Sequence, residues 1–134
     1  MTKILKKKTA LIFGCYGQDG SLIAKSLLKK GYQVIGTSRR KLRDPKNFIA
    51  LNIEKKIEVE SGNIQEVKFV EYIIEKYKPE EIYNLSAQSS VGKSFSDPII
   101  TIESIVNASI NILETSRKLN YKGRIFFAGS SEIF

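Results

Sequence analysis

The stretch Gly14-Cys15-Tyr16-Gly17-Gln18-Asp19-Gly20 separates two segments with different hydrophobic patterns. Residues 9–13 form a largely apolar run, which indicates a buried parallel strand, and residues 21–30 carry apolar side chains at helical spacing. A strand, a glycine turn and a helix in this order are typical of the first βαβ unit of a dinucleotide-binding domain. Glycines at 14 and 17 let backbone N–H groups approach a pyrophosphate, and Gly20 lets the helix pack closely. The N-terminus of that helix then offers free N–H donors to the phosphates.

Strands and helices alternate along the rest of the chain, with short connections. Further strands are predicted at 32–37, 57–60, 82–85 and 124–128, and further helices at 66–77 and 101–119, while 47–52 is ambiguous and suits one helical turn at most. This alternation predicts an α/β fold with a doubly wound parallel sheet of the Rossmann type, in one domain that covers residues 1–134. Ligands of such sheets bind outside the carboxyl ends of the strands.

The composition limits the chemistry that the chain can support. The 134 residues include one cysteine and no histidine, which excludes a histidine-based catalytic triad and a histidine-rich metal site, and we expect no metal. The single Cys15 excludes an internal disulfide and suits a reducing cytoplasm. The apolar run that follows the lysine-rich start ends at Gly14 and is too short to cross a bilayer.

The formal net charge is +8, which raises nucleic-acid binding as an alternative. The lysines are spread over predicted helices and turns, with local clusters only at residues 6–8 and 39–43. This spread favours a solvated surface, and we expect no nucleic-acid partner and no membrane partner. A salt-sensitive gel shift of a nucleic acid by this protein would support the nucleic-acid alternative.

The end of the second predicted strand bears on the choice of nicotinamide cofactor. An NAD site usually places a carboxylate there for the ribose hydroxyls, but Thr37-Ser38-Arg39-Arg40 has none. The guanidinium groups of Arg39 and Arg40 suit the oxygens of a 2′-phosphate. We therefore expect NADP rather than NAD. The alternative is that one or both arginines simply face solvent.

The end of the fifth predicted strand carries two polar side chains that could take part in a reaction. Ser130 offers a hydroxyl that can hydrogen-bond a substrate oxygen. Glu132 offers a carboxylate that can act as a general base or acid in a dry cleft. By residue type alone the same Ser-Ser-Glu sequence is also a good helix start.

Four pieces of sequence together give the chain a resemblance to the extended short-chain dehydrogenase/reductases, and within them to the GDP-mannose 4,6-dehydratases. The pieces are Gly17-Gln18-Asp19-Gly20-Ser21, Arg39-Arg40, Glu81-Ile82-Tyr83-Asn84-Leu85-Ser86-Ala87-Gln88-Ser89 and Ala128-Gly129-Ser130-Ser131-Glu132-Ile133-Phe134. The resemblance runs from about Thr9 to the last residue.

The resemblance implies an enzyme that holds NADP tightly and turns over a nucleotide sugar. In that family, hydride leaves sugar C4 for NADP, water is lost across C5 and C6, and hydride returns to C6. The implied cofactor-binding residues are Gly14, Gly17, Gln18, Asp19 and Gly20 at the pyrophosphate, Arg39 and Arg40 at the 2′-phosphate, Asn63 and Ile64 beside the adenine, and Leu85, Ser86, Ala87, Gln88 and Ser89 on the ribose and nicotinamide side. The implied catalytic residues are Ser130, whose hydroxyl lies at the substrate, and Glu132, which handles the C5 proton.

Several positions depart from the family pattern. Asn63 stands in place of an aspartate, although its amide oxygen can still accept a hydrogen bond from the adenine amine. Ser90 replaces a histidine, and Ile100 stands where a cofactor-contacting tyrosine is expected. Cys15 and Tyr16 are not the usual loop residues, and the sequence offers no physical reason for them.

The family's Tyr-x-x-x-Lys pair should follow the fifth strand, and the sequence ends before it. The one pair of this spacing, Tyr72 and Lys76, falls on the third predicted helix and is expected to be a chance match on a side face. We therefore expect residues 1–134 to be the N-terminal part of a larger enzyme, without the Tyr-x-x-x-Lys helix or the sugar-nucleotide domain. Such a piece alone is expected to be inactive and to expose the apolar flank of its last strand.

The resemblance thus implies an NADP-dependent nucleotide-sugar 4,6-dehydratase, a lyase, with GDP-mannose as the expected substrate and a homo-oligomer as the expected full-length state. A reductase or epimerase of the same superfamily is an alternative, which the carboxylate of Glu132 disfavours. A non-catalytic NADP-binding module is a second alternative. It fits the 134 residues themselves more closely, because they do not include the family's Tyr-x-x-x-Lys pair.

Overall fold

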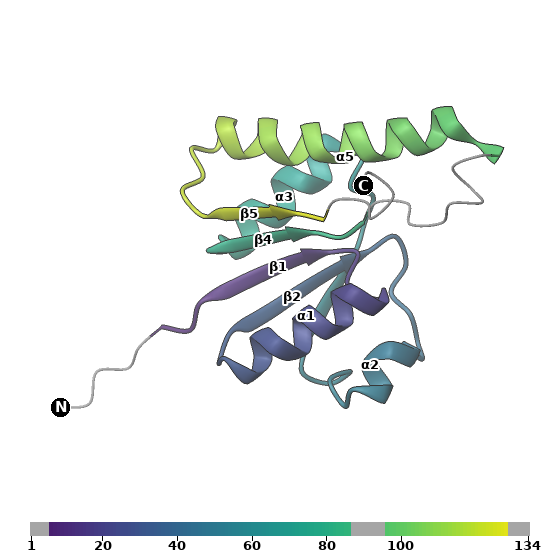
Figure 1. Ribbon diagram of the computed structural model, residues 1–134. Helices are drawn as coiled ribbons and strands as arrows, with labels where there is room; N and C mark the ends of the chain where they lie inside the picture. Colours follow the sequence, from purple (N-terminus) through teal and green to yellow (C-terminus); the bar gives the residue numbers. More distant parts are fainter. Residues whose placement is uncertain (1–5, 87–95, 129–134) are drawn as a thin grey trace.

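A five-stranded parallel sheet between two layers of helices forms the structure, which is a computed structural model describing residues 6–86 and 96–128 (Figure 1). The strands are β1 (Thr9–Phe13), β2 (Gln33–Ser38), β3 (Glu58–Ser61), β4 (Glu81–Asn84) and β5 (Arg124–Phe127). The helices are α1 (Gln18–Lys29), α2 (Lys46–Ala50), α3 (Val67–Tyr77) and α5 (Pro98–Lys118). The predicted doubly wound α/β fold is confirmed.

The strand order is β3-β2-β1-β4-β5, and all four pairings are parallel. The chain therefore runs outward from β1 to β3, crosses back, and continues outward from β4 to β5. Phe13, the last residue of β1, pairs with Thr37 on β2 and with Asn84 on β4. The carboxyl ends of these three strands thus lie level beside the switch point, where ligands of such sheets bind.

The core has one layer on each side of the sheet, because side chains of the central strand alternate between its faces. Ala10 and Ile12 pack on the side of α1 and α2, whereas Leu11 and Phe13 pack on the side of α3 and α5. Every residue of β1 is buried, which explains why its sequence is almost continuously apolar.

All helix and strand bounds among the described residues lie within three residues of the sequence-based ones. The largest shifts are at helix starts: α1 begins at Gln18 instead of 21, and α5 begins at Pro98 instead of 101. Gly17 is the extended N-cap of α1, so Gly20 belongs to the first helical turn. Proline is favourable in the first turn of α5, because its missing N–H would have no partner there. The ambiguous segment 47–52 contains the short helix α2.

The apolar stripe of α5 faces away from the sheet. Its exposed members are Ile102, Ile105, Val106, Ile110 and Leu113, and the buried side carries Ala108, Asn111, Ile112, Thr115 and Ser116. The sequence pattern therefore predicted the helix correctly, but it did not show which face packs on the sheet. Small and medium side chains fill that face, and Ile112 joins the core on this side of the sheet.

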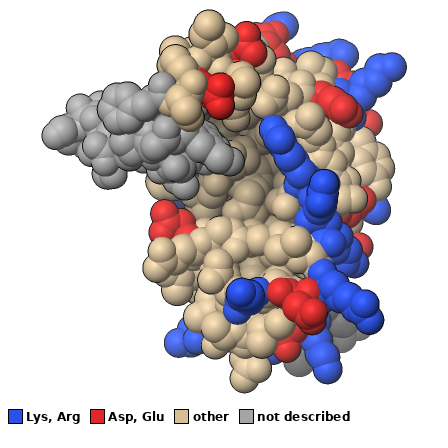
Figure 2. All heavy atoms as spheres, turned by 90° about the vertical axis from the view of Figure 1, so that its right-hand side faces the viewer, with Lys and Arg blue, Asp and Glu red and all other residues tan. Residues whose placement is uncertain are grey.

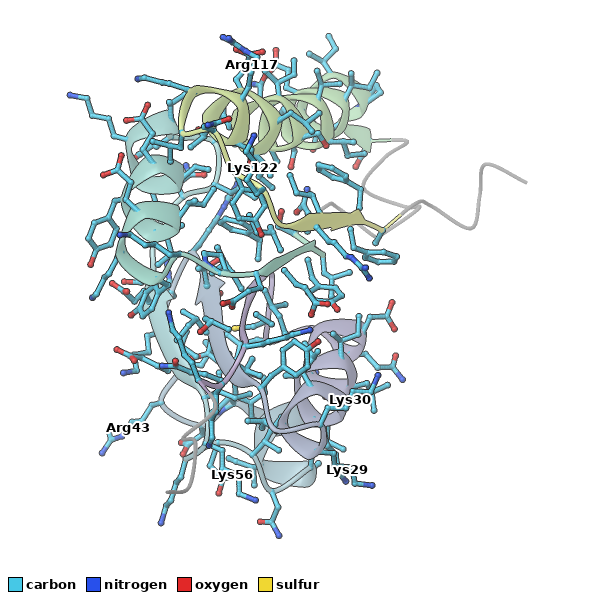
Figure 3. All side chains as sticks on the ribbon, turned by 90° about the vertical axis from the view of Figure 1, so that its left-hand side faces the viewer. Lys29, Lys30, Arg43, Lys56, Arg117 and Lys122 are labelled. Carbon is cyan, nitrogen blue, oxygen red and sulfur yellow. The ribbon has the colours of Figure 1, made fainter. Side chains whose placement is uncertain are left out.

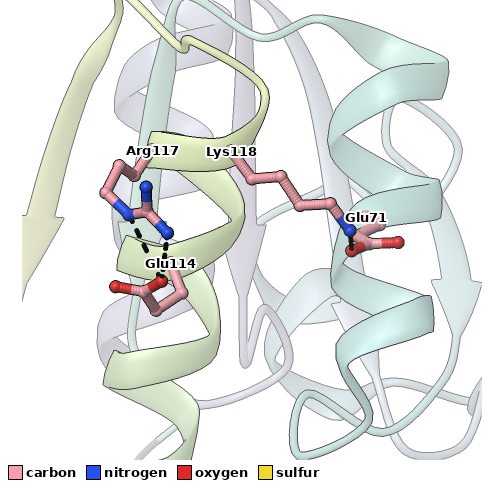
Figure 4. A network of polar contacts seen from close by, with 4 residues as sticks. All are labelled: Glu71, Glu114, Arg117 and Lys118. Atoms are coloured by element: carbon pink, nitrogen blue, oxygen red, sulfur yellow. Dashed lines mark hydrogen bonds and ion pairs between the residues drawn. The ribbon is translucent and has the colours of Figure 1, made fainter.

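Polar contacts join α5 to its neighbour α3 at the surface (Figure 4). Lys118 Nζ lies 2.9 Å from Glu71 Oε1 across the two helices, and Arg117 Nη2 lies 2.9 Å from Glu114 Oε2 within α5. The hydrogen bond to Glu71 raises the pKa of Lys118, and the hydrogen bond from Arg117 lowers the pKa of Glu114. Because the cations are exposed, solvent screens both pairs, and apolar packing carries most of the stability.

At the outer edge of the sheet, β5 pairs with β4 alone among the described residues. Its side chains are exposed or half-buried, and Phe126 is 50% exposed while its ring contacts Tyr83. This agrees with the expected exposed apolar flank of the last strand. None of the helices in residues 6–86 and 96–128 is both long and apolar enough to span a bilayer.

We predict that Gly36→Ala destabilises the protein. A Cβ atom at this buried position of β2 would lie 2.5 Å from Cys15 Sγ and 2.7 Å from Cys15 Cβ. Overpacking of this kind lowers the free energy of unfolding by about 1–3 kcal/mol, measurable by urea denaturation. The control is Ser38→Ala, at the end of the same strand, which should change that free energy by less than about 0.5 kcal/mol. Equal stability of Gly36→Ala and the parent would contradict the packing described here.

Candidate functional site

The glycine loop is held between the carboxyl ends of β2 and β4. The N–H groups of Gly14 and Cys15 both donate to Thr37 O on β2, at 3.1 and 3.2 Å. On the other side, Leu85 N donates to Phe13 O at 2.9 Å. These bonds continue the strand ladder past β1 and place the start of α1 at this edge. Figure 2 shows this face of the molecule, which is hollowed at its centre and has Lys and Arg side chains along one side.

The three glycines of the loop have different spatial roles. Gly14 has a φ of +80°, and a Cβ there would lie 2.6 Å from Leu85 O. A Cβ on Gly20 would lie 2.5 Å from Gly14 O, so this glycine lets the first turn of α1 approach the loop itself. At Gly17 the nearest atom would be 3.8 Å away. Gly14 and Gly20 are therefore needed to close the loop, whereas Gly17 faces the space that a ligand can enter.

The N-terminus of α1 offers unpaired donors beside Gly17. The first N–H groups of a helix have no intrahelical partner, and no described residue accepts from Gln18 N or Asp19 N. Both residues are exposed. The buried Ser21 Oγ lies 2.8 Å from Gly17 O and 2.9 Å from Gln18 O and binds the first turn to the loop. An anion can therefore be bound here by backbone N–H groups and the helix dipole.

Arg39 and Arg40 directly follow β2 and are exposed. Within residues 6–86 and 96–128, neither guanidinium takes part in a hydrogen bond or an ion pair. No carboxylate stands in the 37–40 stretch to compete for them. Both cations are therefore available to an anionic group at this end of the sheet.

Tyr16 connects the glycine loop to the segment that carries these arginines. Its hydroxyl oxygen accepts a hydrogen bond from Leu42 N at 3.2 Å, and its carbonyl oxygen accepts one from Asn47 Nδ2 at 2.8 Å. Its ring lies 4.9 Å, centroid to centroid, from the buried ring of Phe48 on α2. Sequence reasoning missed these contacts because all three partners lie more than 20 positions away along the chain.

The turn after β3 carries Asn63 and Ile64. Asn63 Oδ1 accepts from Gln65 N at 3.0 Å, which shapes the turn and leaves one lone pair of the amide oxygen for a further donor. Asn111 Nδ2, from the buried side of α5, donates to Ile64 O at 3.0 Å. Asn111 is a positioning residue that the sequence did not single out, although a polar side chain within an apolar helix was a signal.

The end of β4 is shaped by Asn84, which is buried. Its Oδ1 accepts from Ser86 N at 3.2 Å and from Ser86 Oγ at 2.7 Å. The structure thus places Leu85 and Ser86 beside the glycine loop. The other predicted residues Ala87, Gln88, Ser89, Ser130 and Glu132, together with Ser90, lie outside the described residues.

Cys15 is fully buried beneath the loop. Burial raises the pKa of its thiol to about 12, so the side chain is a neutral packing group at physiological pH. Its sulfur fills the space left by the missing side chain of Gly36 on β2. This supplies a physical reason for a cysteine in the glycine loop.

Tyr72 and Lys76 hold α3 on the edge strand β3. Tyr72 Oη donates to Glu60 Oε1 at 2.8 Å, and Lys76 Nζ donates to Tyr72 Oη at 3.1 Å and lies 3.1 Å from Glu60 Oε2. Hydrogen bonds to Tyr72 and Glu60 raise the pKa of Lys76 above its usual range. The pair therefore has a structural task on a side face, as the sequence analysis expected.

Two clefts, of about 710 and 840 Å³, lie near the amino ends of the strands, opposite the glycine loop. The first lies among Tyr32, Glu81, Tyr121 and Arg124, and the second is bordered by lysines of α1 and the turn before β3. The basic side chains on this side of the molecule come from separate elements and point outward (Figure 3). Neither cleft includes a glycine loop or a helix N-terminus. Among the described residues, no three His, Cys, Asp or Glu side chains cluster as metal ligands.

A family model described as GDP-mannose 4,6 dehydratase matches residues 11–134. The chain belongs to the GDP-mannose 4,6-dehydratase family. It is 34% identical over 96% of its length to GDP-mannose 4,6 dehydratase 1 of Arabidopsis thaliana, and 36% identical over 95% to the GDP-mannose 4,6-dehydratase of Yersinia enterocolitica. It spans 38% and 36% of the lengths of these two relatives.

Solved structures of epimerases share the fold of this dehydratase-family chain. UDP-glucose 4-epimerase of Thermotoga maritima, solved with UDP-glucose, matches 88% of the chain and 37% of its own length, with a TM-score of 0.73 and 28% identity. UDP-glucose-4-epimerase of Stenotrophomonas maltophila, solved with bound NAD, matches 94% of the chain and 38% of its own length, with a TM-score of 0.82 and 17% identity.

We predict that Gly17→Ala and Gly20→Ala separate ligand binding from loop packing. Gly20→Ala places a methyl group against the Gly14 carbonyl and should lower the free energy of unfolding by about 1–3 kcal/mol in urea denaturation. Gly17→Ala has room for its methyl group and should cost at most about 1 kcal/mol as a poorer N-cap. Because that methyl group occupies the space beside the free N–H groups, Gly17→Ala should weaken dinucleotide binding about tenfold or more. Unchanged binding by Gly17→Ala would place the ligand elsewhere.

We predict that Cys15 resists thiol reagents in the folded protein. With a pKa of about 12, its thiolate fraction at pH 8 is roughly a thousandfold below that of an unfolded chain, and burial blocks access further. The rate of labelling by an aromatic disulfide reagent should therefore rise by about three orders of magnitude in denaturing urea. Fast labelling without urea would show that the loop is not packed as described.

Proposed function

We propose that these 134 residues form the NADP-binding domain of a GDP-mannose 4,6-dehydratase, a lyase that acts on a nucleotide sugar. The observation that carries the proposal is the pair of exposed arginines after β2, next to a glycine loop whose open side borders the first N–H groups of α1. Within residues 6–86 and 96–128, neither these arginines nor these N–H groups have a hydrogen-bonding or ionic partner. The dehydratase family uses a nicotinamide cofactor, which such a loop suits.

The residues present fit a dinucleotide with a 2′-phosphate. Gly14 and Gly20 close the loop, Gly17 leaves space for the pyrophosphate, and Gln18 and Asp19 supply N–H donors. Asn63 and Ile64 border the adenine in this proposal, and residues 85–89 border the ribose and nicotinamide.

The preference for NADP over NAD rests on Arg39 and Arg40. Among the described residues neither guanidinium has an ion pair to break when it binds a phosphate, and its forked N–H groups match two phosphate oxygens. The epimerase from Stenotrophomonas maltophila was solved with NAD, so the fold alone does not choose between the two nucleotides.

For the reaction, we propose Glu132 and Ser130 as the residues that touch the sugar. Bound NADP would accept hydride from C4 and return hydride to C6. Glu132 would take the C5 proton and pass it to the C6 hydroxyl, which leaves as water, and Ser130 would hydrogen-bond a sugar oxygen. These roles come from the family resemblance of the Ser130-Ser131-Glu132 sequence.

An epimerase acting on a related nucleotide sugar is the second candidate, favoured by the fold match to UDP-glucose 4-epimerase at 28% identity. The carboxylate at position 132 supports the dehydratase instead, because water elimination needs a base at C5 and epimerisation at C4 does not. The product separates the two candidates: a 4-keto-6-deoxy sugar shows a dehydratase, and a sugar inverted at C4 shows an epimerase.

We also propose that the full-length protein is a cytoplasmic homo-oligomer. The outward apolar stripe of α5 supports association, since a row of exposed isoleucine and valine side chains is unfavourable in water. The buried reduced thiol of Cys15 supports a reducing compartment.

We predict that the chain binds NADP more tightly than NAD, and that Arg39→Ala or Arg40→Ala removes the preference. Loss of one charge-assisted contact to the 2′-phosphate should cost about 1.5–3 kcal/mol, or roughly ten- to a hundredfold in NADP affinity, by isothermal titration calorimetry. NAD affinity should stay nearly constant.

The control for that titration is Arg117→Ala, which removes an exposed arginine on α5 that is paired with Glu114. It should bind both nucleotides as the parent does. Equal binding of NAD and NADP by the parent would contradict the cofactor assignment. Binding of neither nucleotide by a chain whose circular dichroism shows a folded α/β protein would contradict the assignment of the glycine loop.

A further inference from the structure

We infer that Tyr16 is a positioning residue for the 2′-phosphate site, and that its hydroxyl group fixes the backbone between Arg40 and Arg43 so that the arginines meet the nucleotide. The inference rests on the proposed NADP function and extends it to a residue that never has to touch the cofactor. It assigns a role to Tyr16, which is not the residue usually found at this position of the family's glycine loop.

The arginine segment, residues 39–44, has almost no other support. All six of its residues are exposed. In the part of the chain that the structure describes, the bond from Leu42 N to Tyr16 Oη is the one hydrogen bond that involves this segment, and no ion pair involves it. The segment therefore depends on Tyr16 for its position between Ser38, at the end of β2, and the buried Pro45 before α2.

Tyr16 itself is firmly held, so it can act as a fixed point. Its carbonyl oxygen binds the side chain of Asn47, and its ring packs on the buried Phe48. Its backbone belongs to the loop that is bonded to Thr37 O through the preceding residue, Cys15. One residue thus joins the pyrophosphate loop to the arginine segment and to α2.

The geometry makes the expected effect selective for one nucleotide. NAD and NADP share the pyrophosphate, and both would contact the glycine loop and the start of α1. Only NADP carries the 2′-phosphate that the arginine segment would bind. A loosened segment should therefore weaken NADP binding and leave NAD binding unchanged, whereas a damaged glycine loop should weaken both.

The first test is Tyr16→Phe, which keeps the ring on Phe48 and the carbonyl bond to Asn47 and removes only the acceptor for Leu42 N. The NADP dissociation constant should rise about three- to tenfold, the range of one neutral hydrogen bond, and the NAD constant should change by less than about twofold. Tyr32→Phe is the matched control, because it also removes one tyrosine hydroxyl, which binds Glu81 at the opposite edge of the sheet. It should leave both constants unchanged.

A direct hydrogen bond from Tyr16 to the phosphate is the rival explanation, and a double-mutant cycle separates it from positioning. If Tyr16 acts through the arginines, Tyr16→Phe should have no further effect on NADP binding in an Arg39→Ala/Arg40→Ala background. An effect that persists there overturns the positioning role.

Limited trypsin digestion tests the position of the segment without any nucleotide. Residues 39–43 contain four basic residues after which trypsin cleaves, and Tyr16→Phe should raise the cleavage rate there about three- to tenfold without raising it after Lys55 or Lys56.

Unchanged cleavage, or equal losses of NAD and NADP affinity, overturns the inference. If the parent shows no preference for NADP, the proposed function fails as well, and faster cleavage in Tyr16→Phe would then show a structural clamp without a role at a phosphate.

Discussion

One backbone carbonyl, Thr37 O, carries the constraint on which the candidate site depends. It lies at the end of β2, where the pairing with β1 stops, and it accepts two N–H groups from the glycine loop at 3.1 and 3.2 Å. A buried carbonyl without hydrogen-bond partners would lower the stability of the fold. These two hydrogen bonds therefore favour the observed position of the loop beside β2. The direction in which the chain leaves β1 is thereby set, and the N-terminus of α1 faces the carboxyl ends of the strands.

The same constraint explains why the loop tolerates so few side chains. Between β2 and the Leu85 carbonyl there is no space for a Cβ at Gly14, and between the loop and α1 there is none at Gly20. The close packing also buries Cys15 and turns Tyr16 toward α2. The loop that would bind the phosphates is therefore a packed part of the core on one side and open at Gly17 on the other.

The sequence predicted those features whose cause is local. The apolar runs of β1 and β2 and the helical spacing of α1 and α3 are properties of neighbouring residues, and the strands and helices were found close to their observed bounds.

The outward face of α5 was not predicted, because the spacing of its apolar residues is the same whether the helix turns them toward the sheet or toward a partner. The contacts of Cys15 with Gly36, and of Tyr16 with Leu42 and Phe48, were not predictable either. These partners lie far along the chain, and no sequence pattern indicates such contacts. The proposed roles of Ser130 and Glu132 rest on resemblance alone, because a serine and a glutamate after a strand also suit a helix start.

The close approach of Cys15 to Gly36 has a consequence for how this protein can change over evolutionary time. The two positions share one small volume, which a single sulfur atom fills, although they are 21 residues apart, one in the glycine loop and the other on β2. A side chain at position 36 is acceptable only when the residue at position 15 becomes smaller, so the order in which substitutions arise decides which of them survive. We expect homologous sequences to vary at these two sites together, with the total side-chain volume kept nearly constant.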